Sequence, residues 1–155
     1  MQHFTDLFLA LDQTNKTNEK VAALVHYLHT APEEEKLWAI ALLSGKRPKR
    51  GVRSSDLRAW AAELSALPEW LFEETYHIVG DLAETIAKIL PPNQKENTEN
   101  LNFWIALIQE LPSLELSAKK ERILWAWDHL DAWQRFVFHK MLMGGFRLGL
   151  SQKLT

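Results

Sequence analysis

The sequence predicts an all-α fold, and three observations support this prediction. Apolar residues recur at three- and four-residue steps along most of the chain, which is the spacing of one helix face. No run of alternating β-branched residues is long enough for a strand. The 155 residues are 46% hydrophobic and 25% charged, which fits a compact globular domain and excludes a disordered chain. We expect one multi-helix domain over 1–155, with 1–90 and 101–155 as possible helical lobes.

The first three helices have recognisable starts and stops. One begins near Phe4, and Asn18 can cap the second. The second is expected to bury four aliphatic side chains: Val21, Leu24, Val25 and Leu28. Pro32 suits the first turn of the third helix, and Gly45 is a left-handed stop. The acidic run Glu33–Glu35 favours the positive end of this helix and is interpreted as a solvated face.

Three more helices are expected before residue 91. Ser54–Ser55 restarts a helix, Pro68 opens the next one, and Gly80 ends it. Asp81 and Glu84 then have the spacing of a capping box ahead of a short apolar helix.

The polar segment 91–100 starts with two prolines and has no periodicity, so it is the predicted linker. Three helices should follow it, over about Leu101–Leu111, Ser117–His129 and Asp131–Met143. Asp131 is interpreted as an N-cap, and Gly144 and Gly145 end the last helix. Ser151 looks like the cap of a further helix that the chain end interrupts.

Seven tryptophans could stack on unpaired bases, but most fit a core better. Six lie within helical apolar patterns and are predicted to be buried: Trp38, Trp60, Trp70, Trp104, Trp125 and Trp133. Trp127 lies off the helix face that holds Trp125, so the pattern does not show whether its side chain is buried or exposed.

No catalytic or metal site is expected. The chain has no cysteine, no phosphate-binding glycine loop ending in Gly-Lys-Ser/Thr, no His-Glu-x-x-His and no Gly-x-Ser-x-Gly. His26 and His29 share a helix face and could belong to a metal-dependent hydrolase, but zinc needs a further ligand, and none is apparent nearby. Asp128 and Asp131 could be a carboxylate pair, although capping explains Asp131 better.

Positive charge is concentrated between Lys46 and Arg58. Six cations against Asp56 give this segment a net charge of +5, which leaves −7 for the rest of a chain whose total is −2. Five of these cations are candidate phosphate contacts: Lys46, Arg47, Lys49, Arg50 and Arg53. Pro48 and Gly51 keep the segment out of a helix, so an exposed loop is expected. A solvated turn, or a helical protein-interaction domain whose basic loop meets an acidic partner, remains an alternative.

The C-terminal segment is a second candidate contact. Gly144, Gly145 and Gly149 would let the backbone approach another surface closely. Arg147 stands among apolar neighbours, and a helix starting at Ser151 would favour a phosphate. An ordinary turn, with Arg147 bonded to nearby carbonyls, explains the segment equally well.

Four segments, in this order, resemble the N-terminal DNA-binding domain of ATP-dependent DNA ligases, in particular a bacterial branch. They are Gly45–Arg50, Leu57–Ala61, Gly80–Glu84 and Gly144–Gln152. The resemblance runs from about Phe4 to the chain end. It implies an all-helical domain that grips duplex DNA through the minor groove on both sides of a nick, while adenylation and OB-fold domains close around it.

The resemblance also implies roles for single residues. Gly144, Arg147 and Gly149 match the turn that contacts the backbone and minor groove, and Gly80 has a supporting or contacting place. Physically, glycines there would let the backbone enter a narrow groove.

The resemblance implies ATP and Mg²⁺ for the full ligase and no cofactor in this chain. No Lys-x-Asp-Gly motif, which would carry the lysyl-adenylate, occurs here, and the chain stops where the catalytic domain should begin. We therefore expect sequence-independent DNA binding that supports strand sealing in repair or replication, without sealing by this chain alone. A cytoplasmic location is expected, since no export signal is recognised.

Overall fold

The computed structural model describes residues 1–45, 48 and 50–143, and every regular element within them is helical, which confirms the all-α prediction. The α-helices are α1 (Gln2–Asp12), α2 (Thr17–Thr30), α3 (Glu33–Leu43), α4 (Ser54–Ser65), α5 (Glu69–Val79), α6 (Leu82–Ile89), α7 (Leu101–Glu110), α8 (Leu116–His129) and α9 (Ala132–Met143). A short 3₁₀ turn, η1 (Leu111–Ser113), follows α7. None of these described helices is long and apolar enough to cross a bilayer.

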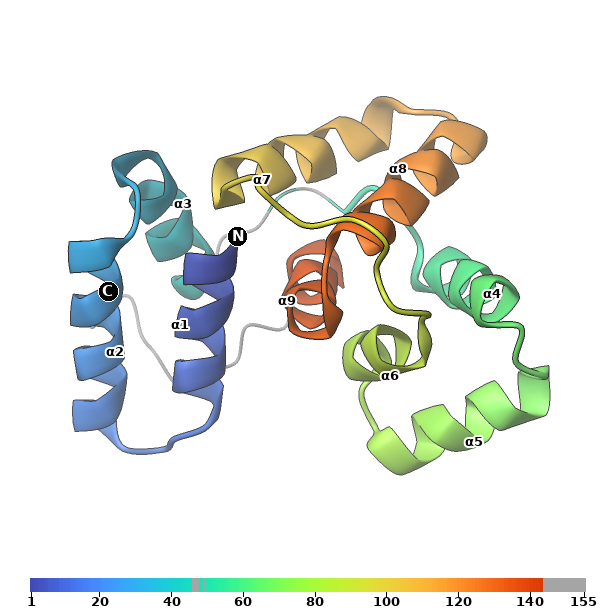
Figure 1. Cartoon of the computed structure of the whole chain (residues 1–155), viewed down its shortest axis with the longest axis horizontal. Helices are drawn as coiled ribbons and strands as arrows, with labels where there is room; N and C mark the ends of the chain where they lie inside the picture. The colour runs from blue at the N-terminus through green and yellow to red at the C-terminus, as the bar shows by residue number, and fades with distance from the viewer. Residues whose placement is uncertain (46–47, 49, 144–155) are drawn as a thin grey trace.

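Helix α9 occupies the centre of the molecule (Figure 1). Helices α1–α3 lie on one side of it and α4–α6 on the other, while α7 and α8 cross above. Helix α9 packs against α6 and α1, and α3 packs against α7. Helices from both expected lobes therefore share one core, and the lobe division at 91–100 stays a prediction.

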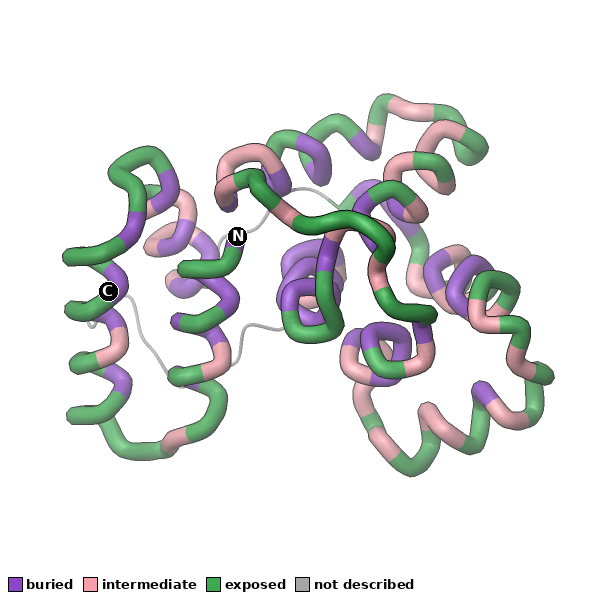
Figure 2. The backbone as a smooth tube through the Cα atoms, in the orientation of Figure 1, coloured by how far each residue is buried: buried purple, intermediate pink, exposed green. Residues whose placement is uncertain are grey.

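Buried residues make up most of α9 and also lie on the neighbouring helices, as the purple parts of the tube in Figure 2 show. Trp104 and Trp60 are buried as predicted, but Trp70, Trp125 and Trp133 are exposed, so these three predictions were wrong. Trp127, whose position was left open, is almost completely buried, because its side of α8 faces α9 and its indole N–H bonds to His139 there.

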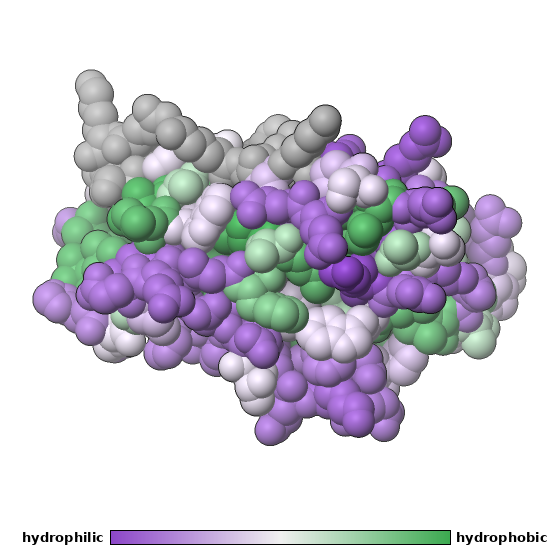
Figure 3. All heavy atoms as spheres, turned by 90° about the horizontal axis from the view of Figure 1, so that it is seen from above, coloured by the Kyte–Doolittle hydropathy of each residue, from purple (hydrophilic) through white to green (hydrophobic). Residues whose placement is uncertain are grey.

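Helix α2 buries a different face from the one predicted. Leu24 and Tyr27 face the core, whereas three of the aliphatic side chains expected inside are exposed: Val21, Val25 and Leu28. The helix is apolar on two sides, and packing against α1 selects one of them. Hydrophobic side chains gather at this α2–α3 end of the molecule in Figure 3. The helix also begins at Thr17, with Lys16 at the N-cap, so Asn18 is not its cap.

Glu35 is not part of a solvated face, because its side chain is fully buried. The hydroxyl of Tyr27 donates to its Oε1 at 2.9 Å, and the backbone N–H of Leu101 donates to Oε2 at 3.3 Å. The amino group of Met1 lies 4.0 Å from the same carboxylate. Burial, together with the neighbouring Glu35 carboxylate, raises the pKa of Tyr27. The carboxylate thus joins α2, α3 and α7.

The predicted helix ends are confirmed where the signal is local. Gly45 and Gly80 have φ angles of +96° and +77°, the left-handed conformation that glycine adopts without steric cost. Asp81 caps α6 by accepting the backbone N–H of Glu84 at 3.2 Å. Asp131 accepts the N–H of Gln134 at 2.9 Å, which confirms its capping role at α9.

Segment 91–100 has no regular structure but is attached to α8. The backbone N–H of Gln94 donates to the Asp128 carboxylate at 2.9 Å, and that of Lys95 donates to the Asp128 carbonyl at 3.0 Å. Asp128 is therefore an anchor for this segment.

Candidate nucleic-acid interface

Many of the predicted contacts lie outside the described residues. They are Lys46, Arg47, Lys49, Gly144, Gly145, Arg147, Gly149 and Ser151. Arg50, Arg53 and Gly80 are described, and so are the residues that flank the two predicted contact segments. The geometry of these flanks shows which parts of the chain the fold brings together.

The described part of the basic loop is anchored to the protein. Pro48, Gly51 and Val52 are buried, so the prediction of an entirely exposed loop was wrong for these residues. A Cβ on Gly51 would lie 2.6 Å from Cβ of Leu111 and 2.8 Å from Cδ of Pro112. Glycine is therefore required here for close approach to η1, and not only to interrupt a helix. Arg50 and Arg53 remain exposed on either side of this anchor.

The basic loop meets the end of α9. Nη2 of Arg50 donates to the backbone carbonyl of Met143 at 3.1 Å. The hydroxyl of Ser54, at the start of α4, lies 3.9 Å from the sulfur of Met143. Because Met143 directly precedes Gly144, the two predicted contact segments leave the described fold at neighbouring points.

The turn at Gly80 is connected to the same end of α9. Nζ of Lys140 lies 2.6 Å from the carboxylate of Asp81, and the ring Nδ1 of His139 lies 3.1 Å from the carbonyl of Ala83. Burial alone would raise the pKa of Asp81, but the bonds from Lys140 and from the backbone lower it. The start of α6 is thus held beside the last turn of α9.

A groove of about 510 Å³ lies between the basic loop and the first turns of α4 and α8. Its lining residues are Arg50, Gly51, Val52, Arg53, Asp56, Leu116 and Lys119. Three cations against one carboxylate, together with two helix N-termini, favour an anion such as phosphate. Lys119 was missed in the sequence because a lysine on an exposed helix has no distinguishing local signal.

Gly80 lies in a different electrostatic environment. It lines a hollow of about 600 Å³ together with Glu73, Glu74, Tyr76 and His77. Carboxylates repel phosphate, so this environment favours a supporting place for Gly80 over direct contact with DNA.

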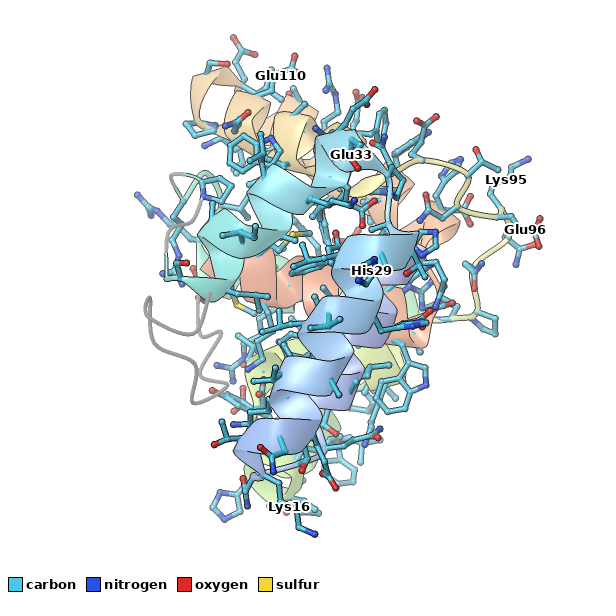
Figure 4. The ribbon with its side chains drawn as sticks, turned by 90° about the vertical axis from the view of Figure 1, so that its left-hand side faces the viewer. Lys16, His29, Glu33, Lys95, Glu96 and Glu110 are labelled. Carbon is cyan, nitrogen blue, oxygen red and sulfur yellow. The ribbon has the colours of Figure 1, made fainter. Side chains whose placement is uncertain are left out.

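His26 and His29 are exposed on α2, and Figure 4 shows His29 on the outer side of this helix. Among residues 1–45, 48 and 50–143, no group of three or more histidine and acidic side chains could hold a metal ion.

Comparisons with known proteins identify the family of this chain. The model of the family described as DNA ligase N terminus matches residues 1–155. A search of curated proteins found no match to the chain. Through the family match, the chain belongs to the N-terminal domains of ATP-dependent DNA ligases, a family that implies DNA and the other ligase domains as partners.

Proposed function

We propose that this chain binds duplex DNA at nicks, without sequence preference, as the non-catalytic N-terminal domain of a ligase. The observation that carries the proposal is the bond from Arg50 to Met143. It joins the basic loop to the point where the glycine- and arginine-containing segment begins. One DNA duplex could therefore contact both segments at once.

The chemistry of the groove supports binding without sequence preference. Arg50 and Arg53 can hold phosphate oxygens through paired N–H donors, and Lys119 adds a point charge. Phosphate contacts fix position on the duplex but carry no base information. The proposed minor-groove contact by Gly144, Arg147 and Gly149 would bring the protein backbone close to the DNA.

The bacterial branch, the cytoplasmic location and a role in repair or replication remain predictions.

The direct test is a fluorescence-anisotropy titration of a labelled nicked duplex. The double variant Arg50→Gln/Arg53→Gln should bind roughly tenfold more weakly than the unmodified chain, since charged hydrogen bonds to phosphate are lost. The matched control is Lys16→Gln/Lys95→Gln, which removes the same charge from exposed positions; Figure 4 shows both lysines at the edge of the molecule. Equal affinity of the two double variants would refute a specific role for the groove.

The salt dependence of the DNA affinity gives an independent measure of phosphate binding. If about five phosphates are neutralised, log affinity should fall against log salt with a slope of about −4.5, and the Arg50→Gln/Arg53→Gln variant should have a slope shallower by about 2. A slope near zero would contradict phosphate binding.

Nick preference and the protein-interaction alternative are tested by separate titrations. An intact duplex of the same sequence should bind more weakly than the nicked duplex, and equal affinity would refute nick preference. Binding to an acidic protein without any binding to duplex DNA would instead support the protein-interaction alternative. Arg147→Ala should weaken DNA binding while the unfolding temperature stays the same.

A further inference from the structure

Helix α5 has one side with no partner in the described fold. Phe72 is its only buried residue, whereas Trp70 is 66% exposed and Ile78 is 80% exposed. Figure 1 places α5 at the periphery, and Figure 2 shows exposed and half-buried residues along most of it. Two large apolar side chains on an outer helix therefore lie in water without any role in the core.

These side chains form a stripe. Trp70, Glu74 and Ile78 follow one another at four-residue steps, so they lie along one face over about 12 Å. Phe72 lies on the opposite face and packs inward. The outer face therefore has an apolar side chain at each end and a carboxylate between them, a row to which the ridge of a second helix could pack.

Acidic side chains lie within the stripe and beside it. Helix α5 carries Glu69, Glu73 and Glu74 and no lysine or arginine. Arg58 of α4 forms an ion pair with Glu73, and its guanidinium lies 5.6 Å from the ring centre of Phe72. This contact holds α5 against α4 and pairs Glu73, so Glu74 is the carboxylate that lies between Trp70 and Ile78 on the outer face.

A hollow adjoins the stripe. Its volume is about 600 Å³, and Glu73, Glu74, Tyr76 and His77 contribute to its walls. Arg58 already pairs with Glu73 and lies 5.7 Å from the ring centre of Tyr76, so a long basic side chain that entered the hollow would have Glu74 as its acidic partner.

We propose that the outer face of α5 docks a basic amphipathic helix of a partner protein. The apolar side of that helix would cover Trp70 and Ile78, and its lysines and arginines would lie beside the glutamates of α5. DNA does not fit this face, because carboxylates repel phosphate. A second copy does not fit either, since symmetric packing would bring like charges together. This face is acidic, whereas the proposed DNA-binding groove is basic, so the two surfaces would bind different partners.

The probe is a labelled 14-residue peptide of leucine and lysine that forms an amphipathic helix, titrated with the 155-residue chain. We expect saturable binding that weakens when salt is raised. Trp70→Ala and Ile78→Ser should each weaken it roughly tenfold, as for a central contact of an interface. Glu74→Lys should weaken it by a similar factor through repulsion.

Matched controls distinguish peptide binding at this surface from nonspecific binding and from binding at the DNA interface. Leu37→Ala removes a side chain that is 77% exposed on α3, and Glu96→Lys reverses an exposed charge that Figure 4 shows away from the core. Both controls, and Arg50→Gln/Arg53→Gln, should keep the peptide affinity. The α5 variants should keep their unfolding temperature and their affinity for nicked DNA.

Three results would overturn the proposal: no saturable binding at millimolar peptide, binding that the α5 substitutions leave unchanged, or equal losses in the α5 and control variants. A failure of DNA binding in the unmodified chain would refute the proposed function alone, because the peptide titration contains no DNA.

Discussion

The protonation of His139 should make the stability of this domain sensitive to mild acid. The side chain is fully buried on α9. Its Nε2 accepts the indole N–H of Trp127 at 2.8 Å, which leaves Nδ1 to donate to the carbonyl of Ala83 at 3.1 Å. Burial lowers the pKa of His139 from 6.5 to about 4, and the positive charge of Arg135 also disfavours the protonated ring.

The sign and size of the effect follow from proton linkage. Below pH 6.5 the unfolded chain binds a proton at His139, whereas the folded chain binds it only near pH 4. The free energy of unfolding should therefore be unaffected by this group above pH 6.5 and fall as the pH falls toward 4. A pKa difference of this size lowers the free energy of unfolding by about 3 kcal/mol at a pH where the folded protein is also protonated, and by about 2 kcal/mol at pH 5.

Urea unfolding at pH 7 and pH 5, followed by circular dichroism, measures this loss. The unmodified chain should lose about 2 kcal/mol more between the two pH values than the variant His139→Gln, which cannot titrate there. The comparison cancels the contributions of the other ionisable groups. The same loss in both proteins would refute the assignment to His139.

Substitutions at three further positions test the contacts that hold the interface and the core, each by urea unfolding. Gly51→Ala should cost about 1–3 kcal/mol, since its Cβ would overlap Leu111, and it should also weaken DNA binding; unchanged stability would show that the loop is not packed on η1. Asp81→Ala should cost about 1–2 kcal/mol by removing the cap of α6 and its ion pair, whereas Asp81→Asn should recover the capping part. Tyr27→Phe should cost about 1–2 kcal/mol, because the buried Glu35 loses a donor; an unchanged unfolding midpoint would contradict that bond.

Helix positions could be predicted because their signals are local. Glycines at 45 and 80 adopt the left-handed conformation, and Asp81 and Asp131 accept backbone N–H groups three residues ahead. These interactions depend on neighbours within one turn, so the amino-acid order alone indicates them.

Burial could not be predicted in the same way. Trp70 and Trp104 both lie within apolar patterns, yet one is exposed and the other is fully buried. Periodicity identifies an apolar face but does not show which other helix, if any, covers it. The burial of the charged residue Glu35 could not be predicted either, since its partners include Leu101, 66 residues away in the chain.

For the candidate interface, the excess of positive charge around Arg50 and Arg53 and the glycines that interrupt the helices are visible in the amino-acid order. The contact of Arg50 with Met143 and the position of Lys119 in the same groove become visible only in the folded chain. Charge and backbone conformation belong to single residues and can be read in order along the chain. The meeting of distant residues depends on how helices pack around α9, and that packing is a property of the whole core.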